Sequence, residues 1–198
     1  MTKNKIKAVA YRQLAEKGYD RATLSSIAKE VGIKTPSIYA FYKNKEDLFM
    51  AVYKDLLQDY YLYMIKAIEQ TSNKGVKERL YQIVEDLCHY HLSQPEKTTS
   101  YMKLSFFLPP TLNDEVKEIF SEMEEALCDV IKGIFSEGIE KGQLKKQSID
   151  DLTASFLCLM DGIFLEMHYY QYHTFKQRVQ QVWNIFWNGI CMNMHQRD

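Results

Sequence analysis

Near its N-terminus the sequence places two apolar segments that are too short to be stable helices on their own. Residues 23–31 and 35–42 are separated by Gly32, a residue type that commonly ends a helix. Because nucleation of an isolated helix is costly, helices of two turns need tertiary packing. The nearest partner is the amphipathic helix that we expect over residues 3–17. Three helices joined by a tight glycine turn predict a helix-turn-helix.

The remainder of the chain also has the pattern of helices. Gly (8) and Pro (4) are scarce, and no segment alternates long enough to predict a half-buried strand. Asn44 and Asp47 predict the start of a long helix that ends near Gln70. We expect later helices at 76–92, around Met102 and Phe106 up to Pro109, and at 113–141, 148–172 and 175–194. The predicted fold is all-α, with a first domain at 1–48 and a second at 49–198.

Charge is distributed unevenly along the chain. The net charge is only -1, but residues 1–50 hold ten Lys/Arg against five acids, and the remainder holds 15 basic and 21 acidic residues. A basic N-terminal module on an acidic body is compatible with binding to a phosphate polyanion, and also with a merely well-solvated surface.

Several classes of protein are disfavoured by the residue pattern. The four cysteines are far apart, which argues against a disulfide framework and fits a reducing cytoplasm. The charged start leads to no apolar signal segment, and no apolar run approaches the ~20 residues of a membrane span. We expect a cytoplasmic protein with no membrane partner.

The second short helix carries the residues that would meet DNA. In a helix-turn-helix this helix enters the major groove with its N-terminus first. Residues 35–37 (Thr-Pro-Ser) provide hydroxyls that can reach base edges or phosphate. Ile38 and Tyr42, four residues apart, can face inward and leave residues 39–41 facing outward or sideways. Lys45 starts the next helix, whose free N–H groups attract phosphate.

The pattern T-x-x-x-I-A-x-x-x-G-I at 23–33, followed by S-I-Y-x-x-Y-x-x-K-x-D-L at 37–48, resembles the TetR family of bacterial transcriptional repressors. The resemblance covers about the first 50 residues. It implies an obligate homodimer with a divergent C-terminal ligand domain, and repression that a small molecule releases. Carried over by position, it assigns DNA contacts to Ser25, Thr35, Pro36, Ser37, Tyr39, Ala40, Phe41 and Lys45. In the family, Tyr39 and Lys45 usually hold phosphates.

Three positions depart from the family pattern. Lys34 stands where many members have a Ser or Thr cap, so we expect Thr35 to cap the helix instead, or Lys34 to join the DNA contacts through a phosphate. Phe41 lacks the hydrogen-bonding group of the His or Tyr that is frequent there. Tyr42 replaces a more common Phe.

Residues beyond position 50 show no nucleophile motif, phosphate loop or paired carboxylates, so we expect no catalytic residues, no cofactor and no enzyme activity. Cys88 and His91 share a helical face, but two ligands do not make a zinc site, and we predict no metal.

Large aromatic and methionine side chains fill the body. Most should be core, but an apolar pocket with a few polar handles needs the same residue types. The resemblance places an effector pocket among these helices, and we expect an apolar or aromatic small molecule there. The predicted ligand-binding residues are Tyr60, Met64, Tyr90, Met102, Phe106, Met123, Asp161, Phe164 and His168. A buried acid or an interface residue is an equally good interpretation of Asp161.

The last two helices carry more apolar surface than one core can cover, which predicts a second partner for one stripe. The predicted interface of a homodimer comprises Phe156, Ile163, Val179, Val182, Phe186 and Ile190. Together these features predict a homodimeric repressor that binds a palindromic operator and responds to a ligand. The alternative is a helical ligand carrier or scaffold without specific DNA binding.

Overall fold

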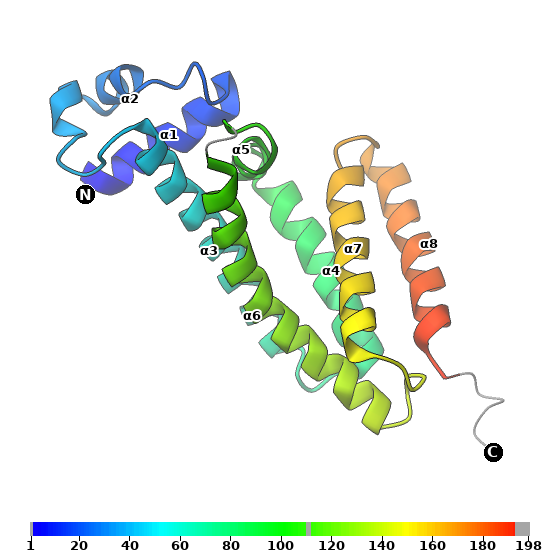
Figure 1. Ribbon diagram of the computed structural model, residues 1–198. Coiled ribbons are helices and arrows are strands. Elements are labelled where there is room, and N and C mark those ends of the chain that lie inside the picture. The colour runs from blue at the N-terminus through cyan, green and yellow to red at the C-terminus, as the bar shows by residue number, and fades with distance from the viewer. Residues whose placement is uncertain (1, 110–111, 193–198) are drawn as a thin grey trace. The chain divides into compact units, whose positions relative to one another are not determined.

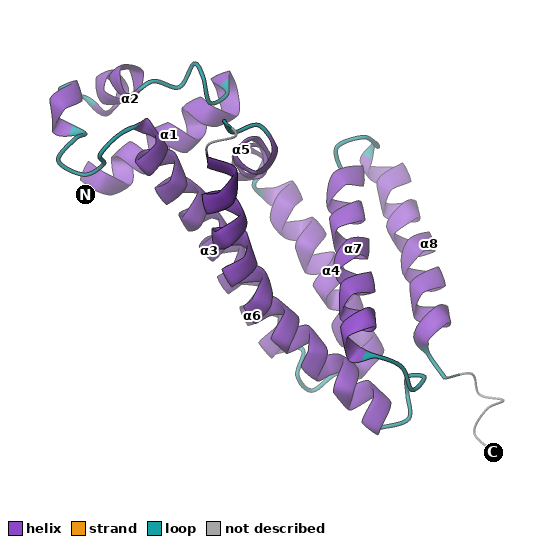
Figure 2. Ribbon diagram, viewed as in Figure 1, coloured by secondary structure: helices purple, strands orange, loops and turns teal. Residues whose placement is uncertain are grey.

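A computed structural model describes residues 2–109 and 112–192 of the chain, and its regular structure is helical (Figures 1 and 2). The elements are α1 (Thr2–Lys17), α2 (Leu24–Val31), the 3₁₀ helix η1 (Thr35–Ser37), α3 (Lys45–Gln70), α4 (Val76–Ser93), α5 (Pro95–Phe106), α6 (Asn113–Glu140), α7 (Ile149–Glu166) and α8 (Tyr172–Ile190). The predicted all-α class is therefore confirmed.

Local sequence signals set the ends of the first helices. The Thr23 side chain accepts a hydrogen bond from the Ser26 backbone N–H. The Ser26 hydroxyl oxygen in turn accepts one from the Thr23 backbone N–H, which completes a capping box at the start of α2. Gly32 ends α2 in the left-handed region with φ of 80°, a conformation that costs glycine little. At α3, the Asn44 side chain accepts from the Asp47 N–H at 2.7 Å.

The segment expected as a regular helix over 35–42 is shorter. Only Thr35–Ser37 forms a 3₁₀ helix, and residues 38–41 continue as turns. Pro36 lies in the first turn and has no N–H to donate. The backbone N–H groups of Ser37 and Ile38 donate to the carbonyls of Lys34 and Thr35, which is the three-residue spacing of a 3₁₀ helix. We had expected Thr35 to cap this helix, and it does not. Lys34 occupies the cap position without a side-chain hydrogen bond.

The helix expected over 148–172 ends at Glu166 instead. No Gly or Pro marks this end in the sequence. The turn is instead held by Arg178 of α8, which forms a two-pronged ion pair with Glu166 and lies 4.5 Å from the ring centre of Tyr170. Beyond α8, Met192 donates to the Gln143 carbonyl at 3.0 Å. Met194, part of the last expected helix, lies outside the described residues.

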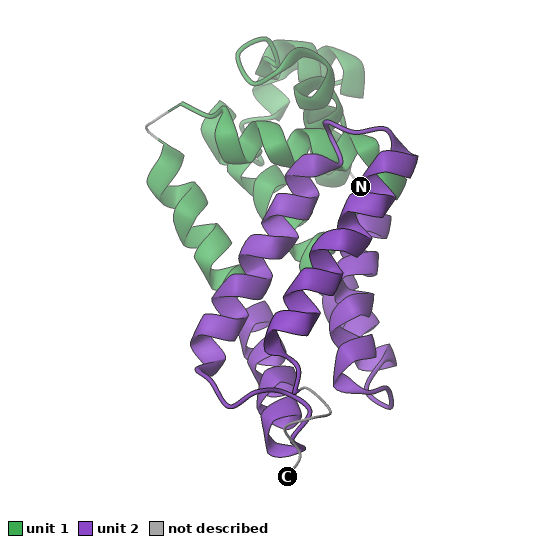
Figure 3. Cartoon of the chain, turned by 90° about the vertical axis from the view of Figure 1, so that its right-hand side faces the viewer, with its two compact units in different colours: residues 1–61, 91–124 green, residues 62–90, 125–198 purple. Residues whose placement is uncertain are grey.

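The helices group into two compact units (Figure 3), which divide the chain differently from the predicted 1–48 and 49–198. The first unit comprises residues 1–61 and 91–124. Its core extends from α1 and α2 to Leu104 of α5 and Val116 of α6. Two polar side chains of α5 reinforce this packing, because Ser100 donates to the Tyr11 carbonyl at 2.8 Å and Lys103 to the Ala15 carbonyl at 2.7 Å. The helix-turn-helix thus shares its core with a later part of the chain.

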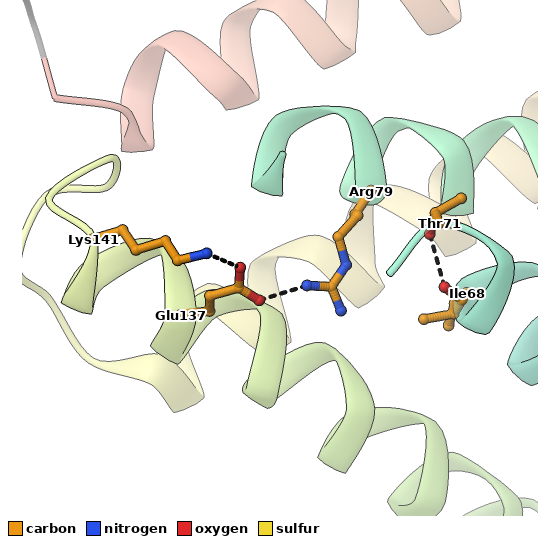
Figure 4. A network of polar contacts seen from close by, with 5 residues as sticks. All are labelled: Ile68, Thr71, Arg79, Glu137 and Lys141. Atoms are coloured by element: carbon orange, nitrogen blue, oxygen red, sulfur yellow. Dashed lines mark hydrogen bonds and ion pairs between the residues drawn. The ribbon is translucent and has the colours of Figure 1, made fainter. Parts of the chain in front are cut away.

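The second unit comprises residues 62–90 and 125–198. Its core is large and apolar, and a polar network lies beside it (Figure 4). Glu137 accepts hydrogen bonds from Arg79 at 2.5 Å and from Lys141 at 2.7 Å. The nearby buried Thr71 hydroxyl donates to the Ile68 carbonyl at 2.8 Å. The bond between Arg79 and Glu137 joins the start of α4 to α6.

Candidate nucleic-acid interface

The turn after η1 separates an inward from an outward set of side chains, as expected. Ile38 and Tyr42 are buried in the core of the first unit. Tyr39 and Phe41 are 57% and 41% exposed, and Ala40 between them is exposed as well. Across residues 2–61, Tyr39 and Phe41 are the exposed large hydrophobic side chains. Exposure of large apolar side chains in this part of the chain is therefore confined to the segment that would face DNA.

The other predicted DNA contacts are also accessible. Ser25, Lys34, Pro36 and Ser37 are exposed, and Thr35 is partly exposed. Ser25 belongs to α2, and Lys34 to Ser37 belong to the turn and η1 that pack on α2.

A polar network around the buried Gln13 supports the helix that carries Ser25. Gln13 of α1 donates to Glu30 at 2.6 Å and accepts from the Ser26 hydroxyl at 2.6 Å. Arg12 forms an ion pair with the same Glu30. The amphipathic pattern identified α1 as the support of this motif, but it gave no sign that buried Gln13 would connect both ends of α2.

Lys45 has partners inside the protein. Its ammonium lies 4.1 Å from the centre of the Tyr19 ring and donates to the Asp20 carbonyl at 3.3 Å. Burial lowers the pKa of Lys45, while the carboxylates of Asp20 and Glu46 act in the opposite direction. The side chain remains partly exposed. Sequence reasoning identified Lys45 but missed Tyr19, whose one signal was its position directly after the Gly18 turn.

The two acids beside Lys45 are engaged within the protein. Glu46 accepts from the Tyr19 hydroxyl at 3.3 Å, and Asp47 accepts from the Lys43 backbone N–H at 2.7 Å. Burial, together with the Glu46 carboxylate, raises the pKa of Tyr19 to about 12, so the phenol stays protonated at neutral pH. Lys34 and Lys43 are exposed basic side chains in the same unit.

Tyr42 carries an unusual feature for a core residue. Its hydroxyl is buried and has no hydrogen-bond partner among the described residues. Burial raises its pKa to about 12. The Lys3 ammonium lies 5.6 Å from the ring centre.

The predicted ligand-binding residues are divided between the two compact units. Tyr60, Met102, Phe106 and Met123 belong to the first unit, and Met64, Tyr90, Asp161, Phe164 and His168 to the second. Met64, Tyr90 and Phe164 are buried, whereas Phe106 is 62% exposed. His168 is exposed and bonds to the Phe164 carbonyl at 3.0 Å. Asp161 is on the exposed face of α7, although partial burial of its carboxyl raises its pKa.

The structure also locates the predicted interface residues. Phe156, Ile163, Val179 and Ile190 are buried within the protomer, so they are part of its own core. Phe186 is half-buried, with its ring 5.7 Å from that of Phe156. Only Val182 of the predicted set is well exposed, at 41%. The apolar stripe that faces outward includes Val182 and five residues outside the predicted set: Cys158, Gly162 and Leu165 of α7, with Ile185 and Gly189 of α8.

Within residues 2–109 and 112–192, no cluster of His, Cys, Asp and Glu could hold a metal ion. Among the helices of the described part, none is long and apolar enough to cross a membrane.

Known proteins match this arrangement. Residues 6–52 match the family described as "Bacterial regulatory proteins, tetR family". The "Fatty acid metabolism regulator protein" of Bacillus subtilis is 26% identical over 137 residues, which cover 69% of this chain and 68% of the relative. The "Biofilm operon icaADBC HTH-type negative transcriptional regulator IcaR" of Staphylococcus epidermidis is 29% identical over 128 residues, which cover 64% of this chain and 65% of IcaR.

Solved structures extend the similarity to the whole fold. The transcriptional regulator FadR of Bacillus subtilis, in complex with stearoyl-CoA, superposes with a TM-score of 0.73 at 20% identity and covers 94% of this chain and 98% of FadR. FadR of Bacillus halodurans superposes with a TM-score of 0.70 at 19% identity, covering 93% of each chain. Both relatives are named as regulators rather than as enzymes, and IcaR as a negative transcriptional regulator. The helix-turn-helix of this chain therefore belongs to the TetR family of bacterial regulatory proteins, and the chain as a whole is similar to transcriptional regulators of that family.

Proposed function

We propose that this protein is a homodimeric repressor that binds a palindromic operator in the cytoplasm and leaves it when a small apolar effector binds the body. The observation that carries the DNA-binding role is the outward set Tyr39, Ala40 and Phe41 on a basic module, with Ile38 and Tyr42 holding it from inside. Lys34 and residues 35–37 provide phosphate and base contacts beside it, and Ser25 contributes from α2.

Selection of binding sites from random DNA by the full chain tests this role. A two-fold symmetric sequence should be enriched, with half-sites separated by about one or more helical turns, near multiples of ~34 Å. Affinity should fall steeply with salt, because phosphate contacts release counterions. A helical ligand carrier would enrich no sequence and would show no salt-dependent binding.

Individual contacts can then be separated by the same assay. Ser37 lies at the end of η1 and is exposed, so Ser37→Ala should change the preferred base at one position per half-site. The slope of log affinity against log salt should stay the same, because no charge is lost. A uniform loss on all sequences would instead assign Ser37 to the phosphate backbone.

The homodimer would form through the outward stripe of α7 and α8. Ile185 is 77% exposed and Leu165 and Val182 are each 41% exposed, which is unusual for such residues on regular helices. Gly162 and Cys158 on the same stripe are small enough for two helices to approach closely. The exposed position of Asp161 on α7 favours its interpretation as an interface residue over its role as a pocket residue.

For the effector we propose a long-chain acyl thioester. Two observations motivate this class: the name of the Bacillus subtilis relative refers to fatty acid metabolism, and a FadR of the same fold was solved with stearoyl-CoA. The body also provides the apolar and aromatic side chains that such a chain requires.

Titration of the operator complex with stearoyl-CoA, free CoA and stearate tests the effector class. Stearoyl-CoA should release the DNA at the lowest concentration. Release by free CoA alone, or by none of the three, would exclude an acyl thioester while leaving the DNA-binding role intact.

A further inference from the structure

Tyr19 occupies the turn between α1 and α2, outside the segment that faces DNA. Gly18 before it adopts φ of 79°, and the turn is closed by Ala22, whose N–H bonds to the Gly18 carbonyl at 3.2 Å. Tyr19 itself is only 8% exposed. Its ring packs on Phe49 of α3, with ring centres 5.2 Å apart. Tyr19 is therefore a fixed platform beside the first turn of α3.

Consecutive residues of α3 hold this platform on two sides. Lys45 lies over the ring face, with its nitrogen 4.1 Å from the ring centre, while Glu46 accepts a hydrogen bond from the Tyr19 hydroxyl at 3.3 Å. The Asp20 carbonyl accepts from the same lysine at 3.3 Å. A cation over an aromatic face is attracted by the ring quadrupole. One side chain thus meets both the ammonium of Lys45 and the carboxylate of Glu46.

We propose that Tyr19 is a positioning residue for DNA binding: its ring and the Asp20 carbonyl hold the Lys45 ammonium in place for an operator phosphate, while its hydroxyl keeps the Glu46 carboxylate directed into the protein. This inference rests on the proposed DNA-binding function.

The geometry provides both halves of this role. An ammonium carries three N–H donors, so the bond to Asp20 and the contact with the ring leave a third for a phosphate oxygen. Lys45 is the first residue of α3, where the helix dipole also favours an anion. A lysine side chain that is already ordered loses less conformational entropy when it binds.

The position of Glu46 matters for the same reason. A carboxylate free to approach the phosphate would oppose the attraction of its neighbour. The bond to the Tyr19 hydroxyl and the burial of that phenol keep this carboxylate occupied. Asp47, the next acid, is likewise occupied by the Lys43 N–H. Both carboxylates keep their charge, but these hydrogen bonds hold them at donors of the protein rather than leaving them free to approach a phosphate bound by Lys45.

A double-mutant cycle on the selected operator tests the proposal. Tyr19→Leu removes the ring, Tyr19→Phe keeps it, and Lys45→Met removes the charge but keeps the length of the side chain. Lys45→Met should lower the magnitude of the salt slope by about 2 per dimer. Tyr19→Leu should weaken binding several-fold, by up to about tenfold per half-site for the lost ordering of one lysine. Tyr19→Phe keeps the ring but frees the Glu46 carboxylate, so it should weaken binding by less than Tyr19→Leu does.

The decisive value is the effect of Tyr19→Leu in the Lys45→Met background. If the ring acts through Lys45, Tyr19→Leu in the Lys45→Met background should cost no more affinity than Tyr19→Phe does in that background. Equal losses in both backgrounds would overturn the proposal, because Tyr19 would then only support the fold. Sequence preference should be unchanged in every variant, since a phosphate contact carries no base information.

A measurement on the wild-type chain covers the case in which Tyr19→Leu does not fold. The ε-methylene protons of Lys45 should show a ring-current shift in NMR spectra of the free protein and keep it on the operator. Loss of the shift on DNA would show that the ammonium leaves the ring, which contradicts the proposed role. If the wild type selects no DNA sequence at all, the proposed function itself fails, an outcome distinct from additive losses on a DNA that it binds.

Discussion

The first unit and the second unit use their surfaces differently. In the first, side chains from α3, α2 and α5 converge on α1: Lys7 pairs with Asp55, Arg12 with Glu30, and Lys103 caps the Ala15 carbonyl. In the second, α7 and α8 present an apolar stripe that includes Ile185. A helix-turn-helix must keep a fixed shape to match the DNA grooves, whereas a body that forms a homodimer has to leave apolar area for its copy.

The largest effect should follow from breaking the apolar stripe of the second unit. Ile185→Asp places a charge in the proposed interface without entering the protomer core, because Ile185 is exposed. Dissociation removes the avidity of two linked half-sites, so operator affinity should fall by about 100-fold or more. Sedimentation velocity and operator titration measure both quantities.

The neighbouring substitution Asn184→Asp adds the same charge at another exposed position and serves as the control. A stable Ile185→Asp dimer with wild-type affinity would show that α8 does not form the interface through this stripe. Phe186→Asp is less informative, since its ring contacts Phe156 and Trp183 and its loss should destabilise the protomer itself.

A second prediction tests whether α5 stabilises the DNA-binding unit. Lys103→Met removes the ammonium that caps the carboxyl end of α1 but keeps the apolar stem. Loss of one such hydrogen bond should lower the free energy of unfolding by about 1 kcal/mol. Denaturant unfolding measures this change, and Lys54→Met, at an exposed position of α3, is the control. If Lys103→Met is as stable as Lys54→Met, the hydrogen bond from α5 does not stabilise the unit that binds DNA.

The same contrast explains what the sequence could predict. In residues 23–48, capping residues, glycine and short apolar periods are local signals, and they correctly predicted α2, the start of α3 and the inward Ile38 and Tyr42. The platform formed by Tyr19 depends on a contact with Lys45, 26 positions away, and no local pattern encodes it.

In α7 and α8 the limit is different. Both stripes of each helix are apolar, so periodicity alone could not decide which stripe faces the protomer core. Phe156 and Val179 prove to be core, and Ile185 faces outward. The end of α7 was also missed, because an ion pair between Glu166 and Arg178 closes a turn that has no Gly or Pro.

Tyr42→Phe should have a smaller effect and the opposite sign. The substitution removes a buried hydroxyl that has no hydrogen-bond partner in the described part of the chain and keeps the ring. An unsatisfied buried polar group costs free energy, so the unfolding free energy should rise by up to about 1 kcal/mol. Thermal and denaturant unfolding measure it. A clear loss of stability would mean that the hydroxyl has a bonded partner in solution, such as a water molecule.

The smallest effect should come from the ion pair at the turn between α7 and α8. Hydrogen bonds from Arg178 hold the pKa of Glu166 below its usual value. A depressed carboxyl pKa contributes stability above the pKa of the unfolded chain, and this contribution is lost as the pH falls through the folded value. Arg178→Gln should therefore reduce stability slightly at neutral pH and not at all at a pH well below 4, where Glu166 is protonated in both states.

Glu137 in the same unit also has a lowered pKa, so the acid dependence of its network must be subtracted. Lys141→Gln is the control for this subtraction, because the hydrogen bond from Lys141 is the largest cause of the lowered Glu137 pKa. If the difference between wild type and Arg178→Gln is the same at neutral and at acid pH, Arg178 stabilises the turn by packing on Tyr170 rather than by its charge.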